Sequence, residues 1–353
     1  MGLSEIPICP ERGEKVRSHK ISLSIALLFS VFFCFIERGA RGAELRPKLE
    51  KGQIEVAIAA VGTLYLPILA AQDAGYFGKY GISVSLNQVS ASTSVQGLIS
   101  GKIDIYQGGA TAISGNLGGA DIIYAAAAVD RSTLVLFGQR GLTSFEGLRG
   151  KSVATTSPGA FGEIALRRSA KEHNLEVGKD IKLLYHRGTP EAFATFLAGH
   201  ADGLIITPPQ SDIARSKGFP VIIDYYERGL KIIGPGTAVT REFFQKNPGT
   251  LRAFLMAYLD GVKRCFEDRP FVDKVNAKYA KISDPQVLEE NYQTGLRVWN
   301  KNMTVDPDAI RIVLEGSANL QAKDADPKRF YDNSIIEALN REYASKLFPG
   351  EVK

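Results

Sequence analysis

The sequence predicts an α/β protein of two lobes, each a mixed, mainly parallel sheet flanked by helices. Three observations support this fold class. Residues 54–86 read as strand, helix and strand, and residues 152–206 repeat that order. Turns rich in glycine, serine and threonine separate the strands from the helices that follow them. A strand–helix–strand unit is by default a parallel pair with a right-handed crossover, and a chain of 353 residues is long enough for two such lobes.

The first unit starts with alternating apolar residues at 54–58, a pattern typical of a short buried strand. Thr63 follows as a candidate N-cap, and Pro67 suits the first turn of a helix, where its missing N–H is not needed. Gly75 is expected to end this helix at positive φ, and residues 82–86 alternate again as a second strand. Ligands of such units bind outside the carboxyl ends of the strands, facing the helix starts.

The next segment completes the first part of the first lobe, which we place at residues 43–140. Residues 92–94 are hydroxyl side chains that can cap a helix ending at Gly101. Further short apolar strands are expected at residues 103–105, 121–129 and 133–137.

The second lobe is expected to span residues 141–233 and to repeat the order of the first. Its expected elements are a strand at 152–154, a loop at 155–159, a helix beginning at Ala160, a strand at 181–185, a helix at 190–197 and a strand at 204–206. Residues 234–240 then return the chain to the first lobe, which continues over residues 234–353. Amphipathic helices are expected there around residues 251–262, 287–299, 308–318 and 335–347.

Several of these segments carry a family resemblance. The run YLPILAAQDAGYFGKYGISVSL, residues 65–86, resembles the opening of the sulfonate, nitrate, taurine and thiamine-precursor family of ABC-transporter solute-binding proteins. The tripeptide GYF and the glycine at position 81 stand at the offsets typical of that family. LISGKID at residues 98–104 matches a second family segment, and GLRGK at 147–151 a third, with Glu146 in place of the usual Asp.

The resemblance implies a type II periplasmic binding protein fold whose lobes close on a solute by hinge motion near residues 140 and 233. It implies a small organic solute or anion of the sulfonate, taurine, nitrate or pyrimidine-precursor class, and it leaves the identity of the solute open. It also implies membrane partners, an ABC permease and its ATPase, while the protein itself is a monomer that performs no chemistry.

The candidate ligand-binding residues stand where strands end and helices begin. They are mostly neutral hydroxyls, small residues and aromatics, which suits a ligand held by N–H groups and hydroxyls rather than by a metal. Helix capping is the alternative role for the hydroxyls. The expected set is Thr63, Tyr65, Ser92, Thr93, Gly109, Ala110, Ser157, Phe161, Thr189 and Thr207.

The N-terminal segment is typical of a secretory signal peptide at residues 1–42. Residues 21–36 are almost wholly apolar, basic residues precede them, and small residues follow them. Cleavage after Gly42 would make the mature protein periplasmic or secreted. A retained membrane anchor is the alternative, although the apolar run is slightly short for a membrane span.

The composition excludes several functions. The formal net charge of +5 includes no basic tract, so nothing supports nucleic-acid binding. The sequence contains no P-loop, no G-x-S-x-G, no metal-ligand spacing and no cysteine pair, and we expect no cofactor. Of Cys9, Cys34 and Cys265, only Cys265 would remain after cleavage, and it is expected to be buried.

Two alternative functions stay open. A periplasmic protein that binds the same solute could feed a sensory receptor instead of a transporter. The family fold also serves a eukaryotic thiamine-pyrimidine synthase, an enzyme with a CCCFC run and a histidine that works with pyridoxal phosphate. This chain contains nothing like CCCFC, which disfavours the enzyme.

Overall fold

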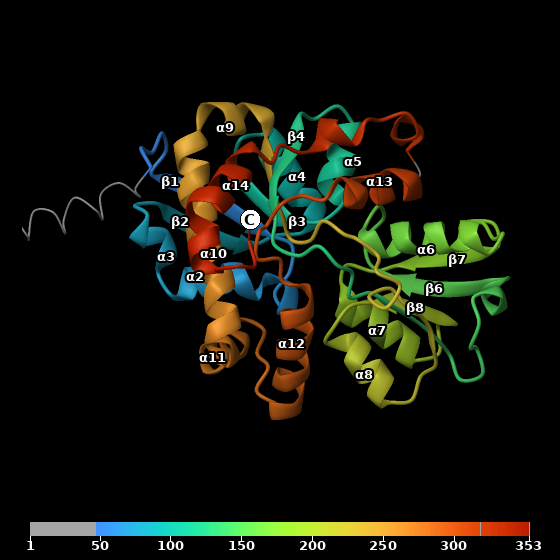
Figure 1. Ribbon diagram of the computed structural model, residues 1–353. Coiled ribbons are helices and arrows are strands. Elements are labelled where there is room, and N and C mark those ends of the chain that lie inside the picture. The colour runs from blue at the N-terminus through green and yellow to red at the C-terminus, as the bar shows by residue number, and fades with distance from the viewer. Residues whose placement is uncertain (1–46, 318, 353) are drawn as a thin grey trace, which may run out of the picture. The chain divides into compact units, whose positions relative to one another are not determined.

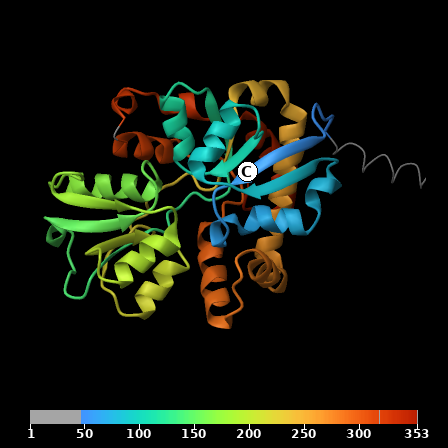
Figure 2. The same ribbon diagram turned by 180° about the vertical axis from the view of Figure 1, so that it is seen from behind.

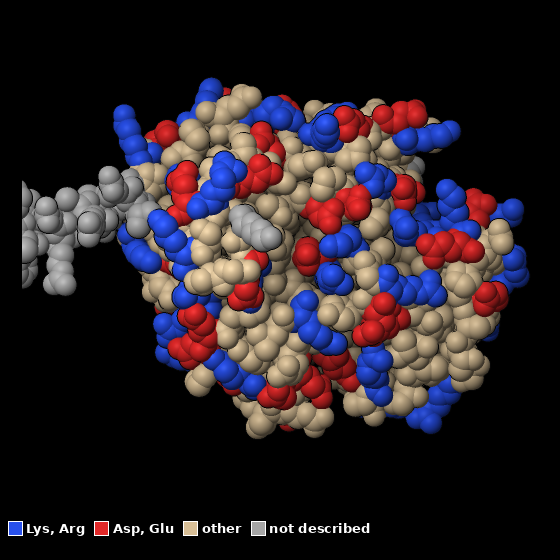
Figure 3. All heavy atoms as spheres, viewed as in Figure 1, with Lys and Arg blue, Asp and Glu red and all other residues tan. Residues whose placement is uncertain are grey.

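The computed structural model of the chain describes residues 47–317 and 319–352 (Figure 1). The expected signal peptide at residues 1–42 lies outside this range. Within it, no helix combines the length and the apolar character that a membrane crossing requires. Lys and Arg side chains are interspersed with Asp and Glu over the face seen in Figure 3, so that face carries no basic patch.

The core of the structure consists of two five-stranded sheets of the same topology. The first has the order β2 (Ser83–Gln88), β1 (Gln53–Ile58), β3 (Ile105–Gly108), β10 (Gly236–Thr240) and β4 (Ile122–Ala127). The second has the order β7 (Ile181–Tyr185), β6 (Lys151–Thr155), β8 (Gly203–Ile206), β5 (Val135–Gly138) and β9 (Val221–Asp224).

Each sheet is mixed and mainly parallel, which confirms the predicted fold class. Strand β1 is parallel to β2 and β3, while β10 runs antiparallel to β3 and β4. In the second sheet β6 is parallel to β7 and β8, while β5 runs antiparallel to β8 and β9. Each sheet therefore receives its one reversed strand from the segment that has just crossed from the other sheet.

The first crossing lies earlier in the chain than we expected. The sequence predicts residues 133–137 in the first lobe, with the boundary after residue 140, but β5 pairs with β8 and β9 of the second sheet. The boundary at 140 was placed at a polar turn, and an apolar run of four residues does not reveal in which sheet it pairs. The chain thus crosses at residues 128–134 and returns at residues 225–235.

The two crossing segments are hydrogen-bonded to each other, and both views show them side by side between the sheets (Figures 1 and 2). The Ser132 N–H donates to the Leu230 carbonyl at 2.9 Å, and the Ile232 N–H donates to the Asp130 carbonyl at 3.1 Å. A paired two-stranded connection resists shear but can bend, so it is suited to act as a hinge.

Helices cover both sheets. The first lobe carries α2 (Leu66–Asp73), α3 (Tyr76–Lys79), α4 (Ala91–Ile99), α5 (Thr111–Leu117), α9 (Arg241–Lys246), α10 (Pro248–Glu267), α11 (Arg269–Tyr279), α12 (Pro285–Val298), α13 (Pro307–Gly316), α14 (Ser334–Leu339) and α15 (Ser345–Leu347). The second carries α6 (Phe161–Glu172), α7 (Thr189–Leu197) and α8 (Gln210–Ser216). Short turns are η1 (Thr63–Tyr65), η2 (Glu146–Leu148), η3 (Leu320–Ala322), η4 (Pro327–Phe330) and the π-helical η5 (Asn340–Ala344).

The helix ends predicted in the first lobe agree with the structure at Gly75 and differ from it at two N-termini. Gly75 has φ 71°, as expected for a residue that ends a helix. Thr63 is not an N-cap: it lies in η1, and α2 begins at Leu66 without a side-chain cap. The cap of α4 is Ser90, whose hydroxyl accepts the Thr93 N–H, because the helix begins one residue earlier than the predicted caps at 92–94.

The core of the first lobe centres on α10, which packs against α2. Gly261 of α10 allows a close approach, because a Cβ there would lie 2.2 Å from the Pro67 carbonyl oxygen and 2.9 Å from the Ala71 Cβ. Cys265, one turn further along α10, is fully buried in this core and forms no disulfide.

Candidate functional site

A cavity of about 180 Å³ lies between the two lobes, at the carboxyl ends of the strands. The first lobe contributes residues that follow β1 and β3, and the second contributes residues that follow β6 and β8. The crossing segments form the floor. The lining residues are Leu64, Tyr65, Gly109, Ser132, Thr133, Leu134, Thr155, Thr156, Phe161, Gly162, Thr189, Ile205, Ile206, Thr207, Ile232, Ile233, Gly234 and Pro235.

Five of the ten expected ligand-binding residues line this cavity: Tyr65, Gly109, Phe161, Thr189 and Thr207. They come from both lobes. Each stands directly after a strand or at the start of a helix, which is the position from which we expected them to face a ligand.

The other five lie outside the lining. Thr63 is buried, and its carbonyl oxygen accepts the Trp299 indole N–H at 2.9 Å. Ala110 is buried in the core at the start of α5. Ser92 and Thr93 are exposed on the first turn of α4, and Ser157 is exposed in the loop before α6.

Two lining residues that sequence reasoning did not select have buried hydroxyls without a hydrogen-bond partner. The Thr155 side chain is 0% exposed and that of Thr133 is 7% exposed, and neither Oγ1 has a partner among the described residues. Buried polar groups are nearly always hydrogen-bonded, so an unpartnered hydroxyl in a cavity wall points to a missing partner in the cavity. The sequence predicts Thr155 as the first residue of the loop after a strand, which is a position from which a side chain can face a ligand, and Thr133 as the first residue of a further strand, which gives no such signal.

The lining contains no residue with a formal charge. Burial raises the pKa of the Tyr65 hydroxyl well above its ordinary value, and neighbouring Tyr106 adds to this effect, so Tyr65 is a neutral phenol at physiological pH. The aromatic rings of Tyr65 and Phe161 offer apolar faces, while threonine hydroxyls offer donors and acceptors.

The helices that begin at the cavity have N-termini without a side-chain cap, as do several other helices such as α5, α8 and α10. No side chain caps α2, α6 or α7. In contrast, α4, α11, α12 and α13 each have a Ser or Asp side chain that accepts a main-chain N–H. Because the first N–H groups of a helix have no partner within it, uncapped helix starts at a cavity can donate to a bound ligand.

The His186 side chain does not line the cavity and instead forms hydrogen bonds within the second lobe. Its Nδ1 lies 3.1 Å from the Thr155 carbonyl oxygen and its Nε2 lies 2.8 Å from the Thr195 hydroxyl. Both ring nitrogens therefore have partners within the second lobe. The described residues contain no cluster of three or more His, Cys, Asp or Glu side chains that could hold a metal ion.

Residues 63–269 match the family model described as NMT1/THI5 like. The chain belongs to this NMT1/THI5-like family. The matched segment includes every residue that lines the cavity, and both crossing segments, whereas α12 and α13 follow it in the sequence.

Relatives of this NMT1/THI5-like chain include named binding proteins. It is 20% identical over 345 residues to YtlA of Bacillus subtilis (strain 168), named as a candidate binding protein, over 93% of this chain and 98% of YtlA. The alkanesulfonate-binding protein SsuA from Xanthomonas axonopodis pv. citri, bound to MOPS, superposes with a TM-score of 0.66 at 17% identity, covering 80% of this chain and 96% of SsuA.

The periplasmic nitrate-binding protein NrtA from Synechocystis PCC 6803 superposes with a TM-score of 0.64 at 14% identity, covering 86% of this chain and 92% of NrtA. These superpositions show that the NMT1/THI5-like chain has the two-lobed fold of periplasmic binding proteins.

Proposed function

We propose that this protein is the extracytoplasmic solute-binding component of an ABC importer. Its two lobes close by hinge motion on a small organic solute or anion of the sulfonate, taurine, nitrate or pyrimidine-precursor class. The observation that carries this proposal is the cavity between the lobes, which is walled by both lobes and floored by the paired crossing segments. A hinge at the floor of a cavity lets ligand contacts on both walls favour closure.

The chemistry of the lining supports a binding role. Unpartnered hydroxyls at Thr133 and Thr155, together with uncapped helix starts, provide hydrogen bonds to an acceptor-rich group of the solute. Tyr65 and Phe161 provide contacts for its apolar part. The lining contains no general acid or base that titrates near neutral pH, so we assign the protein no chemical step.

The same proposal includes the cellular setting. The protein is exported through its N-terminal signal, acts as a monomer, and delivers its solute to a membrane permease driven by an ATPase. Binding proteins of ABC importers supply the precedent: SsuA binds an alkanesulfonate and NrtA binds nitrate.

A ligand screen by thermal shift tests the proposal. Taurine and other alkanesulfonates, nitrate, and pyrimidines are each added to the purified protein. A true ligand raises the unfolding temperature by mass action, because its binding adds about 2.7 kcal/mol to the free energy of unfolding at a hundredfold excess over Kd. Isothermal calorimetry then gives the affinity for Phe161→Ala and for Ser92→Ala, an exposed control on α4. We expect weaker binding only for Phe161→Ala, and equal loss in both would refute the site.

A second measurement separates transport from sensing. The liganded protein is added to vesicles that contain a permease with its ATPase, and ATP hydrolysis is measured. Transport predicts that the liganded protein stimulates hydrolysis more than the ligand-free protein does. Turnover of any screened compound by the purified protein alone would contradict the binding role.

A further inference from the structure

The two lobes already touch along one side. Gly316 at the end of α13 packs on α6, where a Cβ on Gly316 would lie 2.6 Å from the Ile164 Cγ2 and 2.9 Å from its carbonyl oxygen. Arg168 of α6 forms an ion pair with Glu315 of α13 at 2.8 Å. Both views show α6 beside α13 (Figures 1 and 2). This side offers no room for further approach.

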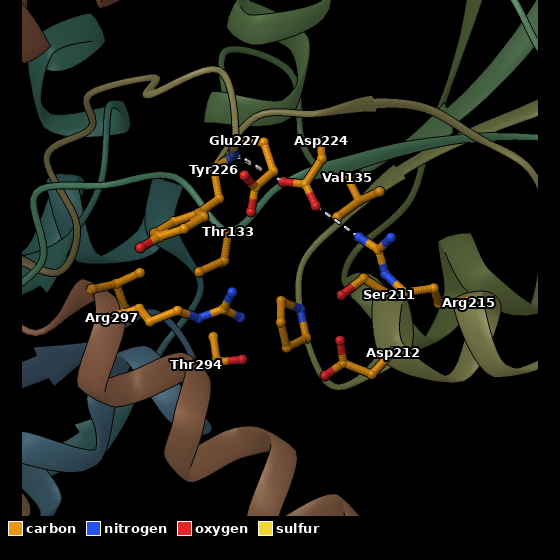
Figure 4. Close-up of a pocket in the computed structure, with 12 residues that line it drawn as sticks. Thr133, Val135, Ser211, Asp212, Arg215, Asp224, Tyr226, Glu227, Thr294 and Arg297 are labelled. Carbon is orange, nitrogen blue, oxygen red and sulfur yellow. Dashed lines mark hydrogen bonds and ion pairs between the residues drawn. The ribbon is translucent and has the colours of Figure 1, made fainter.

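The other side is open. A pocket of about 330 Å³ separates α8 of the second lobe from α12 of the first. It meets the ligand cavity at Thr133, which lines both. Figure 4 shows the Asp212 carboxylate and the Arg297 guanidinium extending into this space from α8 and α12 respectively.

Neither the Asp212 carboxylate nor the Arg297 guanidinium has an ionic partner among the described residues. The Asp212 Oδ2 is buried and accepts no hydrogen bond. The Arg297 guanidinium takes part in none of the ion pairs of the described chain and instead lies over the Tyr226 ring, 4.8 Å from its centroid. The hydroxyl of Ser211, beside Asp212, is also buried without a partner.

The remaining charged groups around Asp212 do not neutralise it. Arg215 on the same helix is held by Asp224 at 2.7 Å, and Glu227 adds another carboxylate to the wall of the pocket. Glu290, on α12, opposes ionisation of Asp212, while Arg215 and Arg297 favour it. The cation on the facing helix that is free to approach Asp212 is therefore Arg297.

We propose that Asp212 and Arg297 form an interlobe latch: bending at the crossing segments, with the α6–α13 contact kept, closes the pocket, brings α8 to α12 and pairs the two side chains. The latch deepens the proposed solute-binding function, because it places part of the closing energy outside the ligand cavity. It also fixes the direction of closure, since one side is packed and the other is open.

The energetics favour such a pair. Asp212 is half-buried, and its buried Oδ2 has no partner, which is costly for a carboxylate; a charge-assisted hydrogen bond to a guanidinium removes that cost. Burial is the largest cause that raises the pKa of Asp212, to about 6, with Glu290 second, which reflects how poorly its charge is stabilised while the lobes are apart. Closure thus offers Asp212 the partner that it lacks in this arrangement.

Distances between spin labels test the latch in ligand-free protein, so that failure leaves the solute-binding proposal intact. Labels are placed at Lys217→Cys beside α8 and Gln293→Cys on α12, both exposed, in full-length chain with Cys9 and Cys34 changed to Ser. A second label pair, Lys171→Cys on α6 and Arg311→Cys on α13, reports the packed side.

We expect two populations for the α8–α12 pair at pH 7.5. Asp212→Asn or Arg297→Gln lowers the short-distance fraction by roughly fivefold, at the lower end of typical coupling, and the double variant lowers it no further. The exchange Asp212→Arg with Arg297→Asp restores it. The matched control Glu227→Gln, which removes another carboxylate of the same pocket, leaves it unchanged, and the α6–α13 distance stays constant in every variant.

Three results would overturn the latch. The short-distance fraction could be the same in Asp212→Asn and Arg297→Gln as in the parent protein. It could rise in Asp212→Asn, which would mean that the carboxylate holds the lobes apart. It could also fall equally in Glu227→Gln, which would mean that the net charge of the pocket matters and the specific pair does not.

Discussion

The Trp299 indole N–H donates a hydrogen bond to the Thr63 carbonyl oxygen at 2.9 Å. This bond joins the end of α12 to the turn that precedes α2, across 236 residues of sequence. The turn also contains Tyr65, a lining residue of the ligand cavity. The C-terminal helices therefore hold one wall of the cavity in place, in addition to covering the first lobe.

Replacing Trp299 by Phe should destabilise the protein. The change keeps an aromatic ring but leaves the buried Thr63 carbonyl without this donor, and it also removes ring volume, so we expect a loss of about 1–3 kcal/mol or more in the free energy of unfolding. Urea unfolding followed by circular dichroism measures this loss. Tryptophan fluorescence cannot be used for the variant, because Trp299 is the one tryptophan of the chain. Tyr292→Phe is the control, because the hydrogen bond that it removes, from the Tyr292 hydroxyl to the Phe266 carbonyl oxygen, is long at 3.4 Å and should contribute less. Equal losses in both variants would contradict a special role for the Trp299 bond.

Thr133→Val and Thr155→Val should have opposite effects on stability and on binding. Each change replaces an unpartnered buried hydroxyl by a methyl group of similar size, which is neutral or stabilising in the ligand-free protein. If these hydroxyls form hydrogen bonds to the ligand, each substitution weakens the binding of a solute found in the screen by roughly 1–2 kcal/mol. Thermal unfolding and calorimetry measure the two quantities. Unchanged affinity in both variants would remove these threonines from the site.

The free energy of unfolding of the wild-type protein should depend on pH through the ionisation of Asp212. Its pKa is raised from 3.8 to about 6 in the folded protein, mainly by burial and then by Glu290. The folded state therefore binds the Asp212 proton more tightly than the unfolded state does, and this group lowers stability as pH rises from about 3.8 through about 6.

Asp212→Asn should accordingly raise the stability of the ligand-free protein at pH 7.5. The gain should shrink as pH falls through about 6 and vanish below about 3.8, where the wild-type carboxyl is protonated in both states. Urea unfolding at a series of pH values measures the difference between variant and wild type. A difference that is constant across this range would show that Asp212 titrates normally.

Gly261→Ala should destabilise the first lobe although alanine is the better helix former. A Cβ at position 261 would lie 2.2 Å from the Pro67 carbonyl oxygen, which is main chain and cannot turn away. Pushing α10 from α2 should cost about 1–3 kcal/mol. Gly78→Ala in α3 is the control, because a Cβ there meets nothing within 4 Å and should be neutral or stabilising by up to about 1 kcal/mol. Urea unfolding measures the stability of both variants. If Gly261→Ala is as stable as Gly78→Ala, the close contact between α10 and α2 is refuted.

The sequence by itself determined the fold class and much of the candidate site. Strand and helix periodicity are local properties, so the strand–helix–strand units at residues 54–86 and 152–206 were predictable, as was the positive φ of Gly75. Parallel strands place their carboxyl ends at one edge, which is why Tyr65 and Phe161 could be selected before any coordinates.

The tertiary structure decided what depends on contacts between distant segments. Strand β5 could pair in either lobe, because an apolar run of four residues reads alike in both sheets. Thr133 became a lining residue only because its segment crosses between the lobes, and Ser92 did not because its helix start faces solvent. Asp212 and Arg297 are 85 positions apart, and only the packing of α8 and α12 around one pocket places their charges opposite each other.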